Sequence, residues 1–327
     1  MNARANILLI RFKAIGDVVL TLPAVNVVRE NFPGAHIAFF TIRENAPLLQ
    51  GFSEVDEVIA LDRAALKNPL RAAPEFFRLV RRLRAGKFST VIDLQGYGET
   101  AWLTRLTGAR ERWGTVYGRG REWAYTRGLA RNEKLHPADW NLFLLRECGL
   151  KAGAIKNQFS LPTDALAAAK KIFADSHLDC SKPTLFVQPF TSSPHKNWPL
   201  ENYLAVARHW RARGVQVVFG GGSGDLAALE PARAEHFPVL ASGPLLGTGG
   251  LMQLSTRVLG GDTGMLHLAI ALGKRAVMLV HNLLPGRPIL YQHIEWVMAA
   301  PKLNHLDSIT VESVIAETAQ AGLGQPI

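Results

Sequence analysis

Short apolar runs alternate with longer helical segments along almost the whole of this 327-residue chain. The apolar runs lie near residues 7–10, 37–41, 57–60, 90–93, 184–188, 215–220, 239–241, 258–260, 276–280 and 296–299. Segments with helical periodicity separate them, at 17–31, 69–85, 163–176, 200–213, 225–236, 265–272 and 310–322, and residues 137–148 close the first half. A strand-helix repeat of this kind folds into parallel sheets with helices on both faces. The sequence therefore predicts an α/β fold.

A hydrophilic stretch at residues 151–182 interrupts the alternation near the middle of the chain. Chains beyond about 250–300 residues usually divide into domains with separate cores. Two sheets explain the pattern better than one very large sheet. We therefore expect two doubly wound, Rossmann-like domains facing across a cleft. They comprise residues 1–160 and residues 161–327, and the second ends in a C-terminal helix.

The composition excludes several classes of protein. Apolar residues make up 48% of the chain and charged residues 20%, which is typical of a globular protein. The two cysteines, Cys148 and Cys180, have no metal-ligand or redox spacing, and the histidines do not cluster. No apolar run is long enough for a signal peptide or a membrane span. We expect a cytoplasmic protein with no metal site and no resident cofactor.

Positive charge is concentrated in the first half of the chain. Residues 1–150 hold 22 Lys+Arg against 15 Asp+Glu, whereas residues 151–327 hold 15 against 12. This imbalance favours an anionic partner for the first domain, either an acidic acceptor molecule or an anionic membrane surface. For any single charge, a solvated helix face is the better interpretation. We do not expect nucleic acid to bind, because the sequence lacks the usual nucleic-acid-binding motifs.

The segment Gly261-Asp262-Thr263-Gly264 joins an apolar run to a helical one. The glycines allow a ligand to approach the backbone closely, and Thr263 offers a hydroxyl. Free N–H groups in the first turn of the following helix favour an anion. The segment therefore predicts a phosphate site.

Two further loops in the second half have polar residues at the end of an apolar run. Thr191 and Ser192 offer hydroxyls and Lys196 an ammonium group, which together suit the oxygens of a diphosphate. A polar turn with a solvated lysine is an equally good interpretation of that loop alone. The glycine-rich loop 220–224 ends at Asp225 and could lie beside a nucleotide's sugar, but it lacks the third glycine of a dinucleotide fingerprint.

Asp17 follows Gly16 where the first apolar run passes into a helical segment. In open α/β sheets ligands bind at the carboxyl ends of the strands, where this residue is expected. Asp17 is either a first-turn aspartate, which stabilises its helix by about 0.3–1 kcal/mol, or a general base. The sequence leaves both roles open.

Four segments together resemble the ADP-heptose:lipopolysaccharide heptosyltransferases. They are residues 11–23 (RFKAIGDVVLTLP), 93–96 (DLQG), 196–199 (KNWP) and 261–267 (GDTGMLH). They keep the family's order over nearly the whole chain. The resemblance implies the GT-B architecture, with a nucleotide-sugar site in the C-terminal domain and an acceptor site in the N-terminal domain. It also implies inverting transfer without a required metal.

The resemblance implies roles for individual residues. Asp17 corresponds to the catalytic base. The expected donor-binding residues are Thr191, Ser192, Lys196, Asp225, Met252, Asp262, Thr263 and Gly264, with Met252 near the adenine. The expected acceptor-binding residues, chosen for their positive charge, are Lys13, Arg81, Arg82 and Arg84.

We therefore expect an inverting, metal-independent glycosyltransferase that moves a heptose from ADP-heptose to the anionic lipopolysaccharide inner core. It would work peripherally at the cytoplasmic face of the inner membrane. Another nucleotide sugar or acceptor on the same fold is an alternative. A nucleotide-sugar-binding protein without turnover is another. The sequence departs from the family pattern at residues 281–285 and 220–224, which bear on the donor's base and sugar.

Overall fold

A computed structural model describes residues 5–67, 69–118, 120–241 and 243–320. By its internal contacts the chain divides into two compact units. The first comprises Met1–Asn157 and Pro285–Arg287, and the second comprises Gln158–Leu284 and Pro288–Ile327. The predicted boundary after residue 160 lies close to the observed division after Asn157. The assignment of Pro285–Arg287 to the first unit was not predicted.

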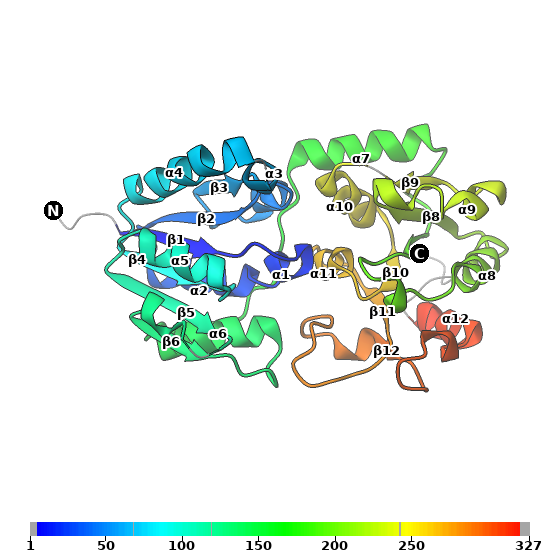
Figure 1. The fold of residues 1–327 in the computed structure, drawn as a ribbon. Helices are drawn as coiled ribbons and strands as arrows, with labels where there is room; N and C mark the ends of the chain where they lie inside the picture. The colour runs from blue at the N-terminus through cyan, green and yellow to red at the C-terminus, as the bar shows by residue number, and fades with distance from the viewer. Residues whose placement is uncertain (1–4, 68, 119, 242, 321–327) are drawn as a thin grey trace. The chain divides into compact units, whose positions relative to one another are not determined.

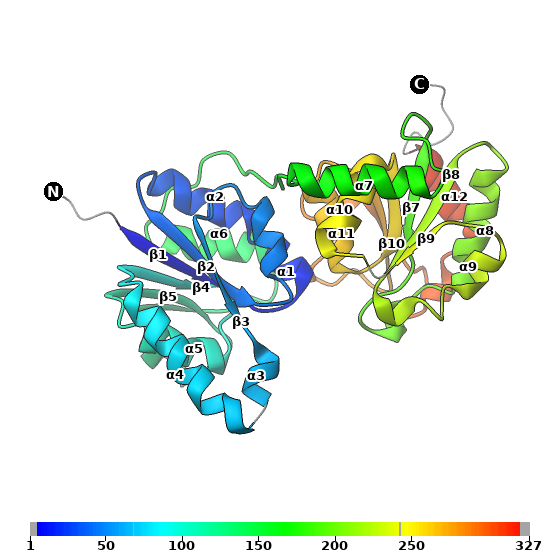
Figure 2. The ribbon, with the colours of Figure 1, turned by 90° about the horizontal axis from the view of Figure 1, so that it is seen from above.

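The first unit is built on a six-stranded parallel sheet in the order β3-β2-β1-β4-β5-β6 (Figure 1). Its strands are β1 (Asn6–Ile10), β2 (His36–Ile42), β3 (Glu57–Leu61), β4 (Thr90–Asp93), β5 (Glu111–Val116) and β6 (Arg127–Ala130). Its α-helices are α1 (Ile15–Val19), α2 (Leu22–Asn31), α3 (Arg63–Lys67), α4 (Pro69–Ala85), α5 (Gly98–Leu106) and α6 (Pro137–Glu147). Helices α2 and α6 cover one face of the sheet, and α4 and α5 the other (Figure 2).

The second unit has a six-stranded parallel sheet in the order β12-β11-β10-β7-β8-β9. Its strands are β7 (Thr184–Gln188), β8 (Gln216–Gly221), β9 (Val239–Ala241), β10 (Arg257–Gly261), β11 (Ala276–Val280) and β12 (Val297–Ala299). Its α-helices are α7 (Thr163–Asp175), α8 (Leu200–Arg211), α9 (Glu230–Ala234), α10 (Leu245–Leu254), α11 (Gly264–Ala271) and α12 (Val311–Gln320). Helices α7, α10 and α11 lie on one face, and α8 and α12 on the other (Figure 2).

Each sheet reverses its strand order once. In the first unit the reversal lies between β1 and β4, and in the second unit between β7 and β10. The parallel registers pair Ile10 with Asp93 and Gln188 with Gly260, so the loops after each strand pair leave the sheet side by side. Such a switch point is where ligands bind in doubly wound folds. Each unit therefore has its own candidate ligand site.

Each unit also has its own hydrophobic core, which holds its sheet and helices together. In the first unit the central strands contribute fully buried residues such as Leu8, Ile10 and Phe40. In the second unit the core around Val187 and Leu259 includes large side chains from α8 and its flanking loop. The central strands are buried on both faces, which explains why they appear as continuous apolar runs in the sequence.

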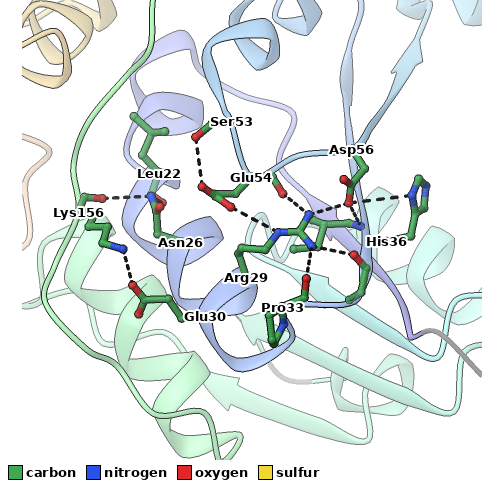
Figure 3. A network of polar contacts seen from close by, with 12 residues as sticks. Leu22, Asn26, Arg29, Glu30, Pro33, His36, Ser53, Glu54, Asp56 and Lys156 are labelled. Carbon is green, nitrogen blue, oxygen red and sulfur yellow. Dashed lines mark hydrogen bonds and ion pairs between the residues drawn. The ribbon is translucent and has the colours of Figure 1, made fainter. Parts of the chain in front are cut away.

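A polar network fastens α2 to the amino ends of β2 and β3 (Figure 3). The Arg29 guanidinium donates to Asp56 Oδ2 at 2.6 Å and to the carbonyls of Glu54 and Ala35 at 2.8 and 2.7 Å. Burial alone would raise the pKa of the Asp56 carboxyl, but the Ile37 N–H and the Arg29 guanidinium outweigh it and hold the pKa below its ordinary value. This network fixes the amino ends of the strands, whereas the switch-point loops leave their carboxyl ends.

The prediction of an α/β fold with two doubly wound parallel sheets is confirmed. All six strands expected in the second half are present, but β5 and β6 were not predicted. Strand β5 contains charged residues and a glycine, and β6 is a short edge strand, so neither forms an apolar run. The single helix expected at 17–31 is divided into α1 and α2 at Leu20 and Thr21.

Candidate functional site

Asp17 lies in the first turn of α1, at the end of the loop that follows β1, and Arg11 holds its carboxylate in place. Arg11 is only 7% exposed. Its guanidinium lies 2.7 Å from Asp17 Oδ2 and donates to the carbonyls of Leu94 and Lys13 at 2.5 and 2.9 Å. The Ala14 N–H also donates to Asp17 Oδ2, at 3.0 Å. Asp17 Oδ1 makes no hydrogen bond to another described residue, and the side chain is 26% exposed. The carboxylate is therefore oriented, and its side chain is partly exposed.

Gln95, in the loop after β4, fixes the backbone of the same loop. Its Oε1 accepts hydrogen bonds from the Phe12 and Lys13 N–H groups, both at 3.0 Å, and its side chain is 1% exposed. Asn45 donates to the Phe12 carbonyl at 2.7 Å from the other side. Lys13 is exposed in this loop, and its contact with an anionic ligand stays a prediction. Two neighbouring switch-point loops therefore determine the position of Asp17.

The buried carboxylate of Asp93 organises the loop that carries Gln95. Its Oδ1 accepts from the Gln95 and Gly96 N–H groups at 2.9 Å, and its Oδ2 accepts from the Tyr125 hydroxyl at 2.7 Å. Burial raises the pKa of the Asp93 carboxyl above its ordinary value despite these donors. Gly96 has a φ of 70°, and a Cβ there would collide with the Thr115 carbonyl. Only glycine fits at this turn.

The three arginines expected to bind the acceptor lie far from Asp17. They are Arg81, Arg82 and Arg84, in the last turns of α4. Arg82 pairs at 3.1 Å with Glu57, the first residue of β3, and Arg84 donates at 3.1 Å to the carbonyl of Leu106, at the end of α5. Both partners lie at the amino ends of the strands, whereas Asp17 lies beyond the carboxyl end of β1. Arg82 and Arg84 therefore lie at the opposite ends of the strands from Asp17, and acceptor binding by the three arginines stays a prediction.

In the second unit, the loops after β7 and β10 meet through an ion pair. Lys196 Nζ lies 2.9 Å from Asp262 Oδ2, with exposed side-chain fractions of 28% and 7%. These are the two residues predicted for the donor's diphosphate and sugar. The lysine is partly accessible, so an anionic ligand could engage its ammonium group. The structure therefore brings the two predicted loops together at the switch point between β7 and β10.

The backbone geometry explains why these two loops approach so closely. A Cβ on Gly261, the last residue of β10, would lie 2.8 Å from Thr191 Cγ2, so a larger residue would push the loops apart. Thr191 also shapes its own loop, since its N–H donates to Asn197 Oδ1 at 2.8 Å and its hydroxyl to the Ser193 carbonyl at 2.9 Å. Ser192 is exposed at the same turn. Thr191 therefore positions the loop, and Ser192 presents a hydroxyl outward.

The remaining predicted donor residues differ in their accessibility. Thr263 is the N-cap of α11 and Gly264 its first residue, and both are partly exposed. Asp225 Oδ2 accepts from the Gly222 N–H at 2.8 Å and closes the glycine-rich loop after β8. Met252, in α10, is completely buried. It offers no surface to an adenine in this arrangement, so we do not assign it a donor contact.

Sequence reasoning gave no individual role to several residues at these two sites. Arg11 and Gln95 were predicted only as members of the segments 11–23 and 93–96. An arginine directly after a buried strand is nevertheless a recognisable signal of a functional residue. His195 and His281 have ring centroids 5.8 Å apart, on the loops after β7 and β11. His195 lies on the same loop as Lys196, and His281 lies on the loop after β11. The described residues contain no group of three or more His, Cys, Asp or Glu side chains placed to hold a metal ion.

The two doubly wound parallel sheets form a fold that solved glycosyltransferase structures share. The model of glycosyltransferase family 9 (heptosyltransferase) matches residues 76–304. The chain therefore belongs to glycosyltransferase family 9, the heptosyltransferases. This confirms the predicted family and the expectation of a glycosyltransferase.

Individual relatives agree with this assignment. The chain is 24% identical to lipopolysaccharide heptosyltransferase 1 of Escherichia coli O18:K1:H7, over 96% of this chain and 98% of the relative. A glycosyl transferase family 9 structure from Veillonella parvula has a TM-score of 0.88 at 21% identity, covering 99% of both chains. The E. coli ADP-heptose lps heptosyltransferase II has a TM-score of 0.80 at 20% identity, covering 97% of this chain and 98% of that one. The predicted GT-B fold is confirmed.

Among the residues that the structure describes, no helix has both the length and the apolar character needed to cross a bilayer.

Proposed function

We propose that the protein transfers a heptose from ADP-heptose to an anionic lipopolysaccharide inner-core acceptor, with inversion at the anomeric carbon. The observation that carries this proposal is the oriented Asp17 carboxylate at one switch point of a heptosyltransferase chain. Arg11 holds its Oδ2 at 2.7 Å and leaves Oδ1 to receive a proton. The names of two relatives, one an ADP-heptose enzyme and the other a lipopolysaccharide heptosyltransferase, support the choice of donor and acceptor.

The donor would bind at the switch point of the second unit. A diphosphate would draw the Lys196 ammonium group toward its oxygens and accept hydrogen bonds from free N–H groups at the start of α11, next to Thr263 and Gly264. The Ser192 hydroxyl is exposed on the neighbouring loop. The Asp262 carboxylate would accept hydrogen bonds from the hydroxyls of the sugar. The Lys196 ammonium group and the N–H groups of α11 would place positive charge at the leaving diphosphate, so transfer would need no resident cofactor or metal.

Asp17 would act as the general base in a single displacement. The acceptor oxygen forms a bond to the anomeric carbon while the bond from that carbon to the phosphate oxygen breaks. The acceptor proton passes to Asp17 Oδ1, and ADP leaves with the bonding electrons. Attack on the face opposite the leaving group inverts the configuration. A positioned base of this kind contributes about 10²–10⁴ in rate.

The acceptor is anionic, and the basic first unit suits it. Lys13 is exposed in the Asp17 loop and would contact an acidic group near the reacting hydroxyl. Such an acceptor is carried by a lipid, so the enzyme would work peripherally at the cytoplasmic face of the inner membrane. The excess of Lys+Arg in residues 1–150 would draw the protein toward that surface.

Replacing Asp17 by Asn tests the proposal. The amide keeps an acceptor for Arg11 but is not a base, so transfer should fall by about two orders of magnitude or more while ADP-heptose binding stays within about twofold. Asp164→Asn is the matched control, because Asp164 is also a first-turn aspartate, in α7. Turnover by Asp17→Asn at the wild-type rate, or an equal loss of donor binding, would contradict the assignment of the base.

A further inference from the structure

The first unit contains an apolar pocket that the proposed chemistry does not use. Its volume is about 450 Å³. Its walls come from α3, α4 and α5, and its floor includes Phe12, Leu61 and Leu103. This volume is typical of small-molecule sites, which range over about 300–1,000 Å³. Hydrocarbon is the ligand chemistry that suits such walls.

Large aromatic side chains surround the mouth of this pocket. Trp102 and Phe76 line it, yet they are 60% and 41% exposed. Trp102 packs against Trp123 with ring centroids 4.4 Å apart, and Phe77, beside Phe76, is 70% exposed. Exposed apolar groups gathered in this way mark a contact surface. Tryptophan in particular is enriched where proteins meet the interface of a bilayer.

Positive charge accompanies these aromatic residues. The sequence from residue 63 to residue 85, which contains α3 and α4, has seven lysines and arginines and one acidic residue. Arg63 and Lys67 line the pocket and form no ion pair with another described residue, while Glu99 is the one acidic residue among those that line it. A helix that combines phenylalanine and leucine with many arginines is typical of a helix lying on an anionic membrane surface. The charge therefore identifies the occupant as anionic.

We propose that this pocket takes one acyl chain of an anionic membrane lipid, with Trp102, Trp123 and Phe77 inserted beside it and the basic residues of α3 and α4 against the headgroups. A second copy of this chain would bring the same positive charge against itself, which disfavours self-association here. Arg81, Arg82 and Arg84 then contribute to the attraction of the lipid surface, although they do not reach the reacting group.

The pocket is next to the proposed acceptor site. Phe12 forms part of its wall and directly precedes Lys13, in the loop that carries Asp17. This inference rests on the proposed function in one respect: the lipid that carries the acceptor sugar is the natural occupant. A chain held in the pocket would keep the attached headgroup near the Asp17 carboxylate.

Vesicle binding by the full chain tests the proposal. Wild-type protein should sediment with vesicles of equal parts phosphatidylglycerol and phosphatidylcholine, and much less with phosphatidylcholine alone or at high salt. The double variant Phe77→Ser and Trp102→Ser should bind the mixed vesicles at least about tenfold more weakly. The matched control is Leu303→Ser, because Leu303 is 66% exposed in the second unit and lies outside this surface. Its binding should equal that of the wild type.

A second measurement separates entry of a chain from adsorption to the surface. Lipids brominated on the acyl chain should quench the tryptophan fluorescence of the wild type, and Trp102→Phe should lose a large part of that quenching. Wild-type protein that binds no anionic vesicles would overturn the proposal. Equal binding by the double variant, or quenching that is unchanged in Trp102→Phe, would overturn it too. An acidic protein partner would then be the better candidate.

The same samples distinguish failure of this inference from failure of the proposed function. Wild-type protein that binds the vesicles through these residues but transfers no heptose would refute the proposed function and support the lipid site. Wild-type protein that transfers heptose but shows no vesicle binding would refute the lipid site and support the function.

Discussion

Gln95 should act as a positioning residue for catalysis, and its replacement by Met tests this role. The substitution nearly keeps the length and volume of the side chain but removes the oxygen that accepts from the Phe12 and Lys13 N–H groups, both at 3.0 Å. The first of these hydrogen bonds is buried and the second is partly buried. Met therefore leaves two backbone donors without their acceptor in the loop that carries Asp17.

The size of the effect follows from these two donors. An unsatisfied buried donor costs about 1–3 kcal/mol, and water can partly satisfy the second, so the free energy of unfolding should fall by about 2–3 kcal/mol. For a unit of this size that corresponds to roughly 4–12 °C in Tm. A displacement of the Asp17 loop by about 1 Å can cost up to about 100-fold in rate, so kcat should fall about 10- to 100-fold.

Thermal unfolding and steady-state transfer at 25 °C, where the variant stays folded, measure both effects. Gln95→Glu keeps an oxygen acceptor and should recover most of the rate. Asn6→Ala is the control, since it removes a 3.0 Å hydrogen bond to the Gly86 carbonyl at the other edge of the sheet. It should lower Tm slightly and leave kcat unchanged. A Gln95→Met enzyme with wild-type kcat, or one no better rescued by Glu, would refute the positioning role.

Two further predictions concern the donor site and the acid stability of the first unit. Lys196→Ala should weaken ADP binding much more than adenosine binding, because only ADP presents a diphosphate to the ammonium group; calorimetry giving equal losses would place Lys196 away from the phosphates. The pKa of Asp56 is lowered in the fold, so its stabilisation is present above its unfolded-state pKa of about 4 and is lost as the pH falls through the folded value. Asp56→Asn should therefore flatten the loss of stability between about pH 5 and pH 2 in urea unfolding, and an unchanged slope would argue against this linkage.

The sequence was sufficient to predict the elements with strong periodicity and clear ends. Helix α4 was predicted with its observed bounds, and β7 and β11 were found as apolar runs. Strands β5 and β6 could not be found in this way, because their stability comes from pairing with β4 and with each other rather than from their own composition. Helix α10, rich in glycine and leucine, has no polar face to reveal its period.

The candidate site was predictable where one residue type has a chemical role of its own. Asp17, Lys196 and Asp262 were proposed on this ground, and their catalytic and binding roles stay predictions. The structure brings the last two together at 2.9 Å. Gln95 was not predictable, because its role depends on which backbone groups lie opposite its side chain after the sheet has formed. The location of Arg82 beside Glu57, at the amino end of β3, was not predictable for a related reason. The net charge of a segment indicates that its surface is basic. The direction of the strands decides whether that surface lies at their amino or their carboxyl ends.

The ion pair between Lys196 and Asp262 has a consequence for the order of events in the proposed reaction. On donor binding, the Lys196 ammonium group would exchange the Asp262 carboxylate for the diphosphate. Little new charge would therefore be neutralised when the nucleotide sugar arrives. While the sugar is present, its hydroxyls can satisfy the Asp262 carboxylate. After transfer, ADP would keep the Lys196 ammonium group at its diphosphate, while the sugar hydroxyls would no longer contact Asp262. The Asp262 carboxylate and the diphosphate would then repel each other. In the proposed reaction the pair would thus favour product release and limit product inhibition.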